Sequence, residues 1–534
     1  MSIIDDLTAD VLIVGAGPSG AVVAHTLASR GFSVVCLEQG GWVNPDDMPG
    51  SKPEFELLTR TQWHWEPNIR GRHEDYPLNM SDANAPVSMF GAVGGSSVVY
   101  GAHWQRLLPS DFRVRTLDGV ADDWPIRYED LEPYYDRIDE FIGVAGLGGD
   151  PAYPPQDFPL PPHPIGKGGL HMGAAMNALG WHIWPGTHAI PSTAYKNMGQ
   201  CVRWGVCERG CPAGAKASFD LAFWPHATAA GAKLVTNARV ARITTGADGL
   251  ADGAIWLDAD GVEHRVHASS VVLAANGIGT PRLLLMSEIA NSSGLVGKNL
   301  MIHPNRGVLG VYDEELESWY GPAGQLLYSL QFYETDAARG FLRGAKWNLM
   351  PLPGVLNVLD LYRDRPFDER WGKAAHALSR RAGKGMIWYC NIDDLPEETN
   401  TVTLDAALTD SSGLPAPKIT YTLSENSLRM LDFMTEKMTE AHRAAGAVDT
   451  FLDPLVPSGH LLGTARMGTD PATSVVDPFG RSHDVPNLFI VDGSVMVTGG
   501  GINPTSTIAS FALRAAEHLA DTAANVPARA TALI

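Results

Sequence analysis

The sequence has few cysteines and no long apolar run. Five cysteines in 534 residues are too few for a disulfide scaffold. No uncharged apolar stretch reaches the roughly 18 residues that a membrane-spanning helix needs, so no transmembrane segment is predicted. The segment 1–10 contains no basic residue and leads directly into a predicted strand, which is unlike a secretory signal. We therefore predict a cytoplasmic protein, or a periplasmic one that is exported only together with a signal-bearing partner.

Basic side chains are also scarce, because 40 Lys and Arg stand against 60 Asp and Glu, for a formal net charge of −20. This balance argues against nucleic acids and anionic membranes as partners. Hydrophobic residues make up 45% of the chain, as in ordinary globular proteins. A chain of 534 residues is longer than a typical domain with a single hydrophobic core, so two domains or one large elaborated core are expected.

A glycine-rich turn follows the first predicted strand. The apolar run 10–14 leads into Gly15-Ala16-Gly17-Pro18-Ser19-Gly20, a helical pattern covers 21–29, and a second strand at 33–37 ends on Glu38. The three glycines would let the backbone approach a pyrophosphate at the helix N-terminus. Glu38 could accept hydrogen bonds from ribose hydroxyls. This order of strand, turn, helix, strand and acid predicts a dinucleotide site, whereas a merely tight turn is the alternative.

A second glycine-rich stretch contains Gly94-Gly95-Ser96-Ser97. Residues this small allow the backbone to lie against a flat ligand such as a flavin ring, although an ordinary turn is an equal alternative. The segment 270–277 reads as a buried strand that ends in a further glycine turn. It resembles the return of the chain to a nucleotide-binding sheet.

A histidine and an asparagine each lie in a glycine-rich loop near the C-terminus. His460 precedes Gly463-Thr464-Ala465-Arg466-Met467-Gly468, and Asn503 follows Gly500-Gly501-Ile502. A neutral imidazole can take a proton near pH 7, and an amide beside it can hold a hydroxyl oxygen. The pair therefore indicates proton transfer from a bound hydroxyl group.

Two predicted elements frame this pair. A strand at 487–491 runs into Asp492-Gly493-Ser494, and a helix over 507–520 can begin at Pro504. The N-terminus of that helix would place partial positive charge near Asn503, where a reduced flavin accumulates negative charge.

Cys201, Cys207 and Cys211 lie close together in the sequence, and a proline follows the last of them. Three thiols could ligate an iron–sulfur cluster, but the fixed ferredoxin spacings are not matched and a fourth nearby cysteine is missing. The alternatives are a disulfide plus a free thiol, or simply buried small side chains.

Taken in order, these motifs resemble the glucose–methanol–choline (GMC) oxidoreductase family. The resemblance covers the first fifty residues, about 90–145, 200–305 and 455–520. It implies an α/β fold in which a Rossmann-like FAD-binding domain of the FAD-GR type is interleaved with an α+β substrate-binding domain built on an antiparallel sheet. We predict the FAD-binding domain at 1–50, 200–305 and 455–534, and the substrate-binding domain with covering loops at 51–199 and 306–454.

The resemblance also assigns the site. His460 would accept the hydroxyl proton while the substrate carbon passes a hydride to flavin N5, and Asn503 would position the oxygen. Because the pair contains one titrating group, activity is expected to rise through a single histidine pKa near neutral pH. The residues assigned to cofactor binding are Gly15, Gly17, Gly20, Glu38, Gly94, Gly95, Ser96, Ser97, Val240, Ala275, Asp492, Gly493, Pro504 and Thr505.

Three positions qualify this assignment. Some members attach FAD through a histidine four residues past the position of Gly95, where this chain has Val99, so noncovalent FAD is expected. Tyr100 replaces an asparagine that many members have, and His103 lies off the register of the covalent histidine. A further histidine, His303, is expected to be structural rather than a ligand.

The cysteine passage resembles a branch of the family that holds membrane-linked sugar dehydrogenases and long-chain alcohol oxidases. Some of these sugar dehydrogenases carry a three-iron cluster and a small subunit. We therefore predict FAD-dependent oxidation of a sugar or glycoside hydroxyl, with Cys201, Cys207 and Cys211 as candidate iron–sulfur ligands. A small subunit and a cytochrome acceptor are candidate partners. The alternatives are an oxidase that uses O₂ on long-chain or aryl alcohols, and a lyase that keeps FAD without redox chemistry.

Overall fold

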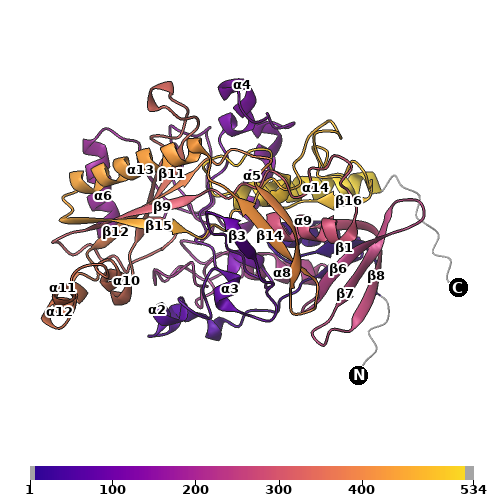
Figure 1. Cartoon of the computed structure of the whole chain (residues 1–534), viewed down its shortest axis with the longest axis horizontal. Helices are drawn as coiled ribbons and strands as arrows, with labels where there is room; N and C mark the ends of the chain where they lie inside the picture. Colours follow the sequence, from indigo (N-terminus) through magenta and orange to yellow (C-terminus); the bar gives the residue numbers. More distant parts are fainter. Residues whose placement is uncertain (1–6, 524–534) are drawn as a thin grey trace.

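The computed structural model describes residues 7–523, in which two large sheets lie toward opposite ends of the long axis (Figure 1). A three-stranded sheet is drawn between them. The helices are α1 (Pro18–Ser29), α2 (Phe55–Leu58), α3 (Pro67–Arg70), α4 (Val114–Asp118), α5 (Tyr128–Ile142), α6 (Gly166–Ala178), α7 (Phe219–Ala222), α8 (Trp224–Ala229), α9 (Asn276–Ser287), α10 (Val355–Asp360), α11 (Phe367–Arg370), α12 (Lys373–Ser379), α13 (Glu425–Ala444) and α14 (Thr505–Ala523). In this described part of the chain, no helix is long and apolar enough to cross a bilayer.

The first sheet has seven strands in the order β5-β2-β1-β8-β7-β6, and β16 also pairs with β8. Its strands are β1 (Leu7–Val14), β2 (Val34–Leu37), β5 (Lys233–Val235), β6 (Arg239–Thr245), β7 (Ala251–Leu257), β8 (Glu263–Leu273) and β16 (Leu488–Ile490). The pairs around β1 are parallel, with Ile13 opposite Cys36 on one side and Val272 on the other. Because parallel strands are covered on both faces, they read as continuous apolar runs, and this is the predicted nucleotide-binding sheet.

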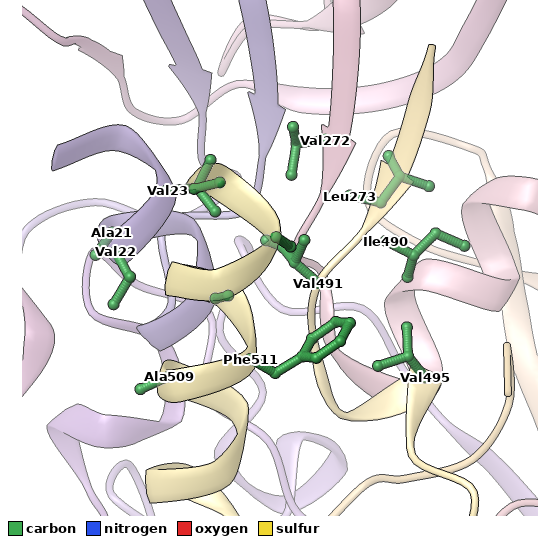
Figure 2. Close-up of a cluster of buried hydrophobic side chains, with 14 of the residues drawn as sticks. Ala21, Val22, Val23, Val272, Leu273, Ile490, Val491, Val495, Ala509 and Phe511 are labelled. Carbon is green, nitrogen blue, oxygen red and sulfur yellow. The ribbon is translucent and has the colours of Figure 1, made fainter. Parts of the chain in front are cut away.

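Two helices from opposite ends of the chain pack together beside this sheet. Figure 2 shows apolar side chains of α1, α14, β8 and β16 meeting in one buried cluster, among them Ala21, Val22, Val23, Val272, Leu273, Ile490, Ala509 and Phe511. Full burial of a large apolar side chain contributes about 1.5–3 kcal/mol. This cluster therefore holds the C-terminal motif segment against the N-terminal one.

The second large sheet is antiparallel throughout, in the order β15-β9-β12-β11-β10-β4. Its strands are β4 (Trp184–Pro185), β9 (Asn305–Val311), β10 (Leu327–Ser329), β11 (Ala345–Pro351), β12 (Gly385–Ile392) and β15 (Asp449–Val456). The small sheet consists of β3 (Asn79–Ala83), β13 (Thr401–Thr409) and β14 (Pro415–Tyr421). The antiparallel sheet confirms the predicted fold class. The predicted break at 454/455 falls inside β15, and the domain boundaries stay a prediction.

Local hydrogen bonds fix where two of the longer helices begin. Helix α5 begins at Tyr128, because the Asp130 carboxylate accepts from the Arg127 N–H at 2.8 Å. Ser424 is the N-cap of α13, since its hydroxyl accepts from the Ser427 N–H at 3.1 Å.

Candidate functional site

A cavity of about 370 Å³ is lined both by the glycine turn after β1 and by the loops that carry His460 and Asn503. It therefore joins motifs from the two ends of the sequence. Most of the residues predicted to bind the cofactor line this one cavity: Gly15, Gly17, Glu38, Gly95, Ser96, Ser97, Val240, Ala275, Asp492, Gly493, Pro504 and Thr505.

The two predicted cofactor residues absent from the cavity wall, Gly20 and Gly94, shape its turns. A Cβ on Gly20 would lie 2.0 Å from the carbonyl oxygen of Gly15. Gly94 has φ +90°, and a Cβ there would meet the backbone nitrogen of Asp220 at 2.8 Å. Both positions therefore require glycine for close backbone approach rather than for contact with a ligand.

The N-terminus of α1 is built for an anion. Gly17 is its N-cap and supplies no side-chain oxygen, so no side chain satisfies the first N–H groups of the helix. The second glycine loop lies directly against the first, because a Cβ on Gly95 would meet the Cα of Gly17 at 3.0 Å. This backbone cradle fits a pyrophosphate.

Glu38 stands at the end of β2 with both carboxylate oxygens in use. Oε2 accepts from the Ala16 N–H and Oε1 from the Gly40 N–H, each at 2.8 Å. Burial raises the pKa of this carboxyl to about 7, although the two backbone bonds act in the opposite direction. Ribose hydroxyls donating to the remaining lone pairs would favour the charged form, so the position fits a dinucleotide.

Asp492 fixes the loop after β16 to the start of α9. Its carboxylate accepts from the Thr280 hydroxyl at 2.5 Å, from the Asn276 N–H at 3.1 Å and from the Ser494 N–H at 2.9 Å. Burial raises its pKa, and these bonds lower it. The residue thus positions Gly493 and Ala275 at the cavity wall.

His460 and Asn503 meet at the cavity. The Asn503 Nδ2 amide lies 3.3 Å from His460 Nε2, and His460 Nδ1 lies 3.1 Å from Nδ1 of His303. His303, expected to be structural, is fully buried and packs edge-on against His460 with ring centroids 5.1 Å apart. It therefore positions His460 directly, a role that its isolated place in the sequence did not reveal.

Lys346 determines how the Asn503 amide is oriented. Its ammonium nitrogen lies 2.7 Å from Asn503 Oδ1 and 2.6 Å from Gln105 Oε1, and the Asn391 amide donates to the same Asn503 oxygen at 3.0 Å. Two donors at the oxygen fix the NH₂ group of Asn503 toward His460. Lys346 and Gln105 are fully or almost fully buried and carried no motif in the sequence.

This network also fixes the tautomer of His460. Because the Asn503 NH₂ group donates to Nε2, that nitrogen must be an acceptor, so the ring proton lies on Nδ1 and is donated to His303. The nitrogen that faces the cavity is therefore the basic one. A hydroxyl group beside Asn503 would find both a proton acceptor and a hydrogen-bond donor.

Burial holds the pKa of His460 well below 6.5, and nearby His303, His103 and Lys346 lower it further. A histidine that accepts a proton must be neutral. With His460 as the predicted base, its lowered pKa moves the expected acid limb of activity to a lower pH than the rise near neutral pH that the sequence predicts, and the pH profile stays a prediction.

His103, which is out of register with the family's covalent histidine, belongs to the same site. Its Nδ1 lies 3.2 Å from Asn503 Oδ1, and the residue lines the cavity. Val99 and Tyr100 also line the cavity, and the Tyr100 hydroxyl donates to the Ala217 carbonyl at 2.9 Å. The phenol is thus held by the protein backbone.

Cys201, Cys207 and Cys211 stay a predicted set of iron–sulfur ligands. All three are free thiols, and within residues 7–523 no group of three His, Cys, Asp or Glu side chains is placed to hold a metal ion. The Cys211 sulfur accepts from the Ala215 N–H at 3.3 Å. Burial raises the pKa of the Cys207 thiol to about 12.

Known proteins with similar sequences identify the family. Residues 9–305 and 396–512 match the N- and C-terminal models described as GMC oxidoreductase. The chain is 40% identical to a 2-methyl-1,2-propanediol dehydrogenase of Mycolicibacterium austroafricanum, over 96% of this chain and 95% of that one. It is 30% identical to a fructose dehydrogenase large subunit of Gluconobacter japonicus, over 96% and 98%.

An oxidase and a solved structure are similar as well. The identity to a paromamine 6'-oxidase of Streptomyces fradiae is 31%, over 97% of this chain and 92% of that one. A formate oxidase of Aspergillus oryzae RIB40 superposes with a TM-score of 0.66 at 17% identity, over 97% and 99% of the two chains. The latter similarity is one of fold.

Proposed function

The chain belongs to the GMC oxidoreductase family, and from this premise we propose that it oxidises an alcohol CH–OH group to a carbonyl with FAD, with His460 as the base. One observation carries the proposal: a cavity that begins at a dinucleotide cradle also contains the basic nitrogen of His460, 3.3 Å from the Asn503 amide. The proposed proton acceptor His460, the hydroxyl-binding amide of Asn503 and the cofactor cradle thus line the same cavity.

FAD fits the residues that are present. The free N–H groups of α1 would hold its pyrophosphate, and Glu38 would accept from its ribose. When bound, FAD supplies the hydride acceptor. The formate oxidase of Aspergillus oryzae, whose FAD modification was studied with that structure, has a similar fold.

The protein's own residues handle the proton. His460 Nε2 accepts it from the substrate hydroxyl, while the Asn503 NH₂ group donates to the substrate oxygen. The substrate carbon loses a hydride as its C–O bond becomes a carbonyl, so one proton and one hydride leave together. Lys346 and Asn391 keep Asn503 oriented, and His303 keeps His460 oriented, which lowers the cost of reaching the reactive geometry.

We propose a dehydrogenase acting on a sugar or another small hydroxylated substrate, as the diol and fructose dehydrogenase relatives suggest. The paromamine 6'-oxidase relative favours an O₂-using oxidase as the second candidate. The fructose dehydrogenase relative is a large subunit, which supports a separate small subunit as a partner. A cytochrome acceptor and a cytoplasmic location, with co-export as the alternative, belong to the same proposal.

Noncovalent FAD belongs to the same proposal, because Val99 offers no nucleophile at the position of the covalent histidine. Acid precipitation of the purified protein should release all flavin into the supernatant. Flavin that stays with the precipitated protein would overturn the proposal that FAD is bound noncovalently.

The function is tested by anaerobic mixing with a panel of sugars, diols and simple alcohols. Substrate should bleach the flavin band near about 450 nm, and a dye acceptor should restore it faster than air does. Rapid reoxidation by O₂ with stoichiometric peroxide would favour the oxidase. Cleavage of an adduct without bleaching would favour the lyase and overturn the proposal.

A further inference from the structure

The face of the large antiparallel sheet that points to the cavity is polar. Alternate residues on β11 and β12 face the opposite way into the apolar core under α13, among them Trp347, Leu349, Trp388 and Cys390. The residues between them face the cavity side, and those that line the cavity are Asn348, Met350, Tyr389 and Asn391, joined by Asn305 of β9. Three amides on three adjacent strands therefore border the space beside the reactive pair.

Strand pairing places these amides close to His460 and Asn503. Asn391 is opposite Lys346 on one side and Asn305 on the other, and adjacent strands lie about 4.8 Å apart. Asn348 is two residues from Lys346 on the same face, about 6.8 Å along β11. All three amides are thus within one small molecule's length of the Asn503 oxygen that Asn391 and Lys346 contact.

Two of these amides have an oxygen without a protein partner. The side-chain oxygens of Asn305 and Asn348 are buried and have no hydrogen-bond partner in the protein, whereas Asn391 donates to Asn503. A buried acceptor without a partner costs about 1–3 kcal/mol, so such groups are completed by a ligand or by ordered water. Nε2 of His103, which also lines the cavity, has no partner either.

His103 and Asn348 are neighbours on the cavity wall. Burial first, and then Lys346, lower the pKa of His103 to about 3, whereas hydrogen bonding to Asn503, Gly324 and Asn348 acts in the opposite direction. His103 Nε2 and Asn348 Oδ1 are left without a partner of hydrogen-bond geometry. Because His103 Nδ1 faces the acceptor Asn503 Oδ1 and so carries the ring proton, both of these free atoms are acceptors, to which a hydroxyl group can donate and an apolar carbon chain cannot.

We propose that Asn305, Asn348 and His103 form a subsite for a second hydroxyl group of the substrate. This inference rests on the proposed alcohol oxidation and names its substrate class: diols and polyols, sugars included, rather than long-chain or aryl monohydric alcohols.

Other polar groups fit this subsite less well. A carboxylate would place its oxygens against the Asn305 and Asn348 acceptors. An ammonium group would lie near the Lys346 ammonium, which already touches Asn503. A neutral hydroxyl group can donate to the Asn305 and Asn348 oxygens and is not repelled by the Lys346 ammonium.

The first test uses the wild-type holoenzyme and a matched set of 1,2-butanediol, 1-butanol and 2-butanol. The kcat/KM for the diol should exceed that for either monohydric alcohol at least about tenfold, because the monohydric alcohols leave the buried acceptors unpaired. Equal values for the three compounds would overturn the subsite while leaving alcohol oxidation intact. Failure of all three, and of sugars, to bleach the flavin would instead overturn the proposed function.

The second test replaces the amides by a side chain of similar shape. Asn348→Leu and Asn305→Leu should each lower the diol preference, which is kcat/KM for 1,2-butanediol divided by kcat/KM for 1-butanol, at least about threefold. Asn426→Leu is the matched control, because that amide binds the Leu342 backbone outside the cavity. Flavin content, read from the absorption spectrum, shows that each variant is folded and loaded. A loaded variant that keeps the full preference would refute the role of that amide.

Discussion

The two ends of the cavity are built by different means. The proposed cofactor end is formed by backbone N–H groups, by glycines whose Cβ would collide with neighbouring backbone, and by Glu38. At the substrate end, they come from buried side chains, each of which orients the next: Lys346, Asn391, Asn503, His460 and His303. Most side-chain substitutions leave a backbone cradle intact. In a network of side chains, by contrast, one substitution changes the orientation of the neighbouring side chains.

The largest effect is expected at His460. His460→Gln removes the proton acceptor and should lower kcat by about 10²–10⁴-fold, the usual contribution of a general base. Flavin content should not change, because the cofactor end is built from other residues. Steady-state kinetics and absorption spectra measure both quantities. His376→Gln, on the exposed side of α12, is the control; a kcat within threefold of wild type in His460→Gln would mean that another group is the base.

The next largest effect is expected at the other end of the cavity. Glu38→Gln replaces a charged acceptor by a neutral amide and should weaken FAD binding about tenfold or more, since hydrogen bonds to charged groups contribute about 1.5–3 kcal/mol. At saturating FAD, kcat should stay near the wild-type value. Titration of the flavin-free protein by fluorescence gives the affinity. A lower kcat with unchanged affinity would contradict the division of labour between the two ends.

Substitution of Lys346 is expected to lower the rate less, but to shift the pH dependence of activity in a diagnostic direction. Lys346→Met removes a donor to Asn503 and should lower kcat about tenfold. It also removes a positive neighbour that lowers the pKa of His460, so the acid limb of the kcat/KM profile should move to higher pH. The measurement is the pH profile of the variant beside that of Lys373→Met, an exposed lysine of α12. An unmoved acid limb would show that Lys346 is only structural.

The smallest effect is expected in the cysteine passage. Cys207→Ser should change kcat less than about twofold, because no metal site involves this thiol in the described residues. Iron and acid-labile sulfide analysis of anaerobically purified protein should find neither. Stoichiometric iron that is lost in the variant would restore the cluster hypothesis.

Most of the residues that the sequence assigns to the cofactor, together with His460 and Asn503, line one cavity in the structure, and their roles stay a prediction. That they could be found at all has a physical reason. Gly15, Gly17 and Glu38 act within a single strand–turn–helix–strand unit, so their spacing alone reveals them. His460 and Asn503 could be found because each lies in a recognisable glycine-rich loop.

The residues that orient this pair left no such signal. Lys346 and Asn391 are alternate residues of two strands that meet only through antiparallel pairing, and His103 and His303 come from separate loops. Their roles depend on long-range register, which local patterns do not encode. The cysteines show the converse: Cys201, Cys207 and Cys211 are close in sequence, yet within residues 7–523 no three metal-ligating side chains are placed to hold a metal ion.

The most direct test of the account is anaerobic stopped-flow reduction of the enzyme's flavin by a saturating substrate, in wild-type and His460→Gln protein. The wild-type flavin absorption band at about 450 nm should bleach within one turnover time. In the His460→Gln variant, equally loaded with FAD, the band should bleach at least about 100-fold more slowly. Equal rates in the two proteins, or a wild-type flavin that no hydroxylated substrate reduces, would contradict the account.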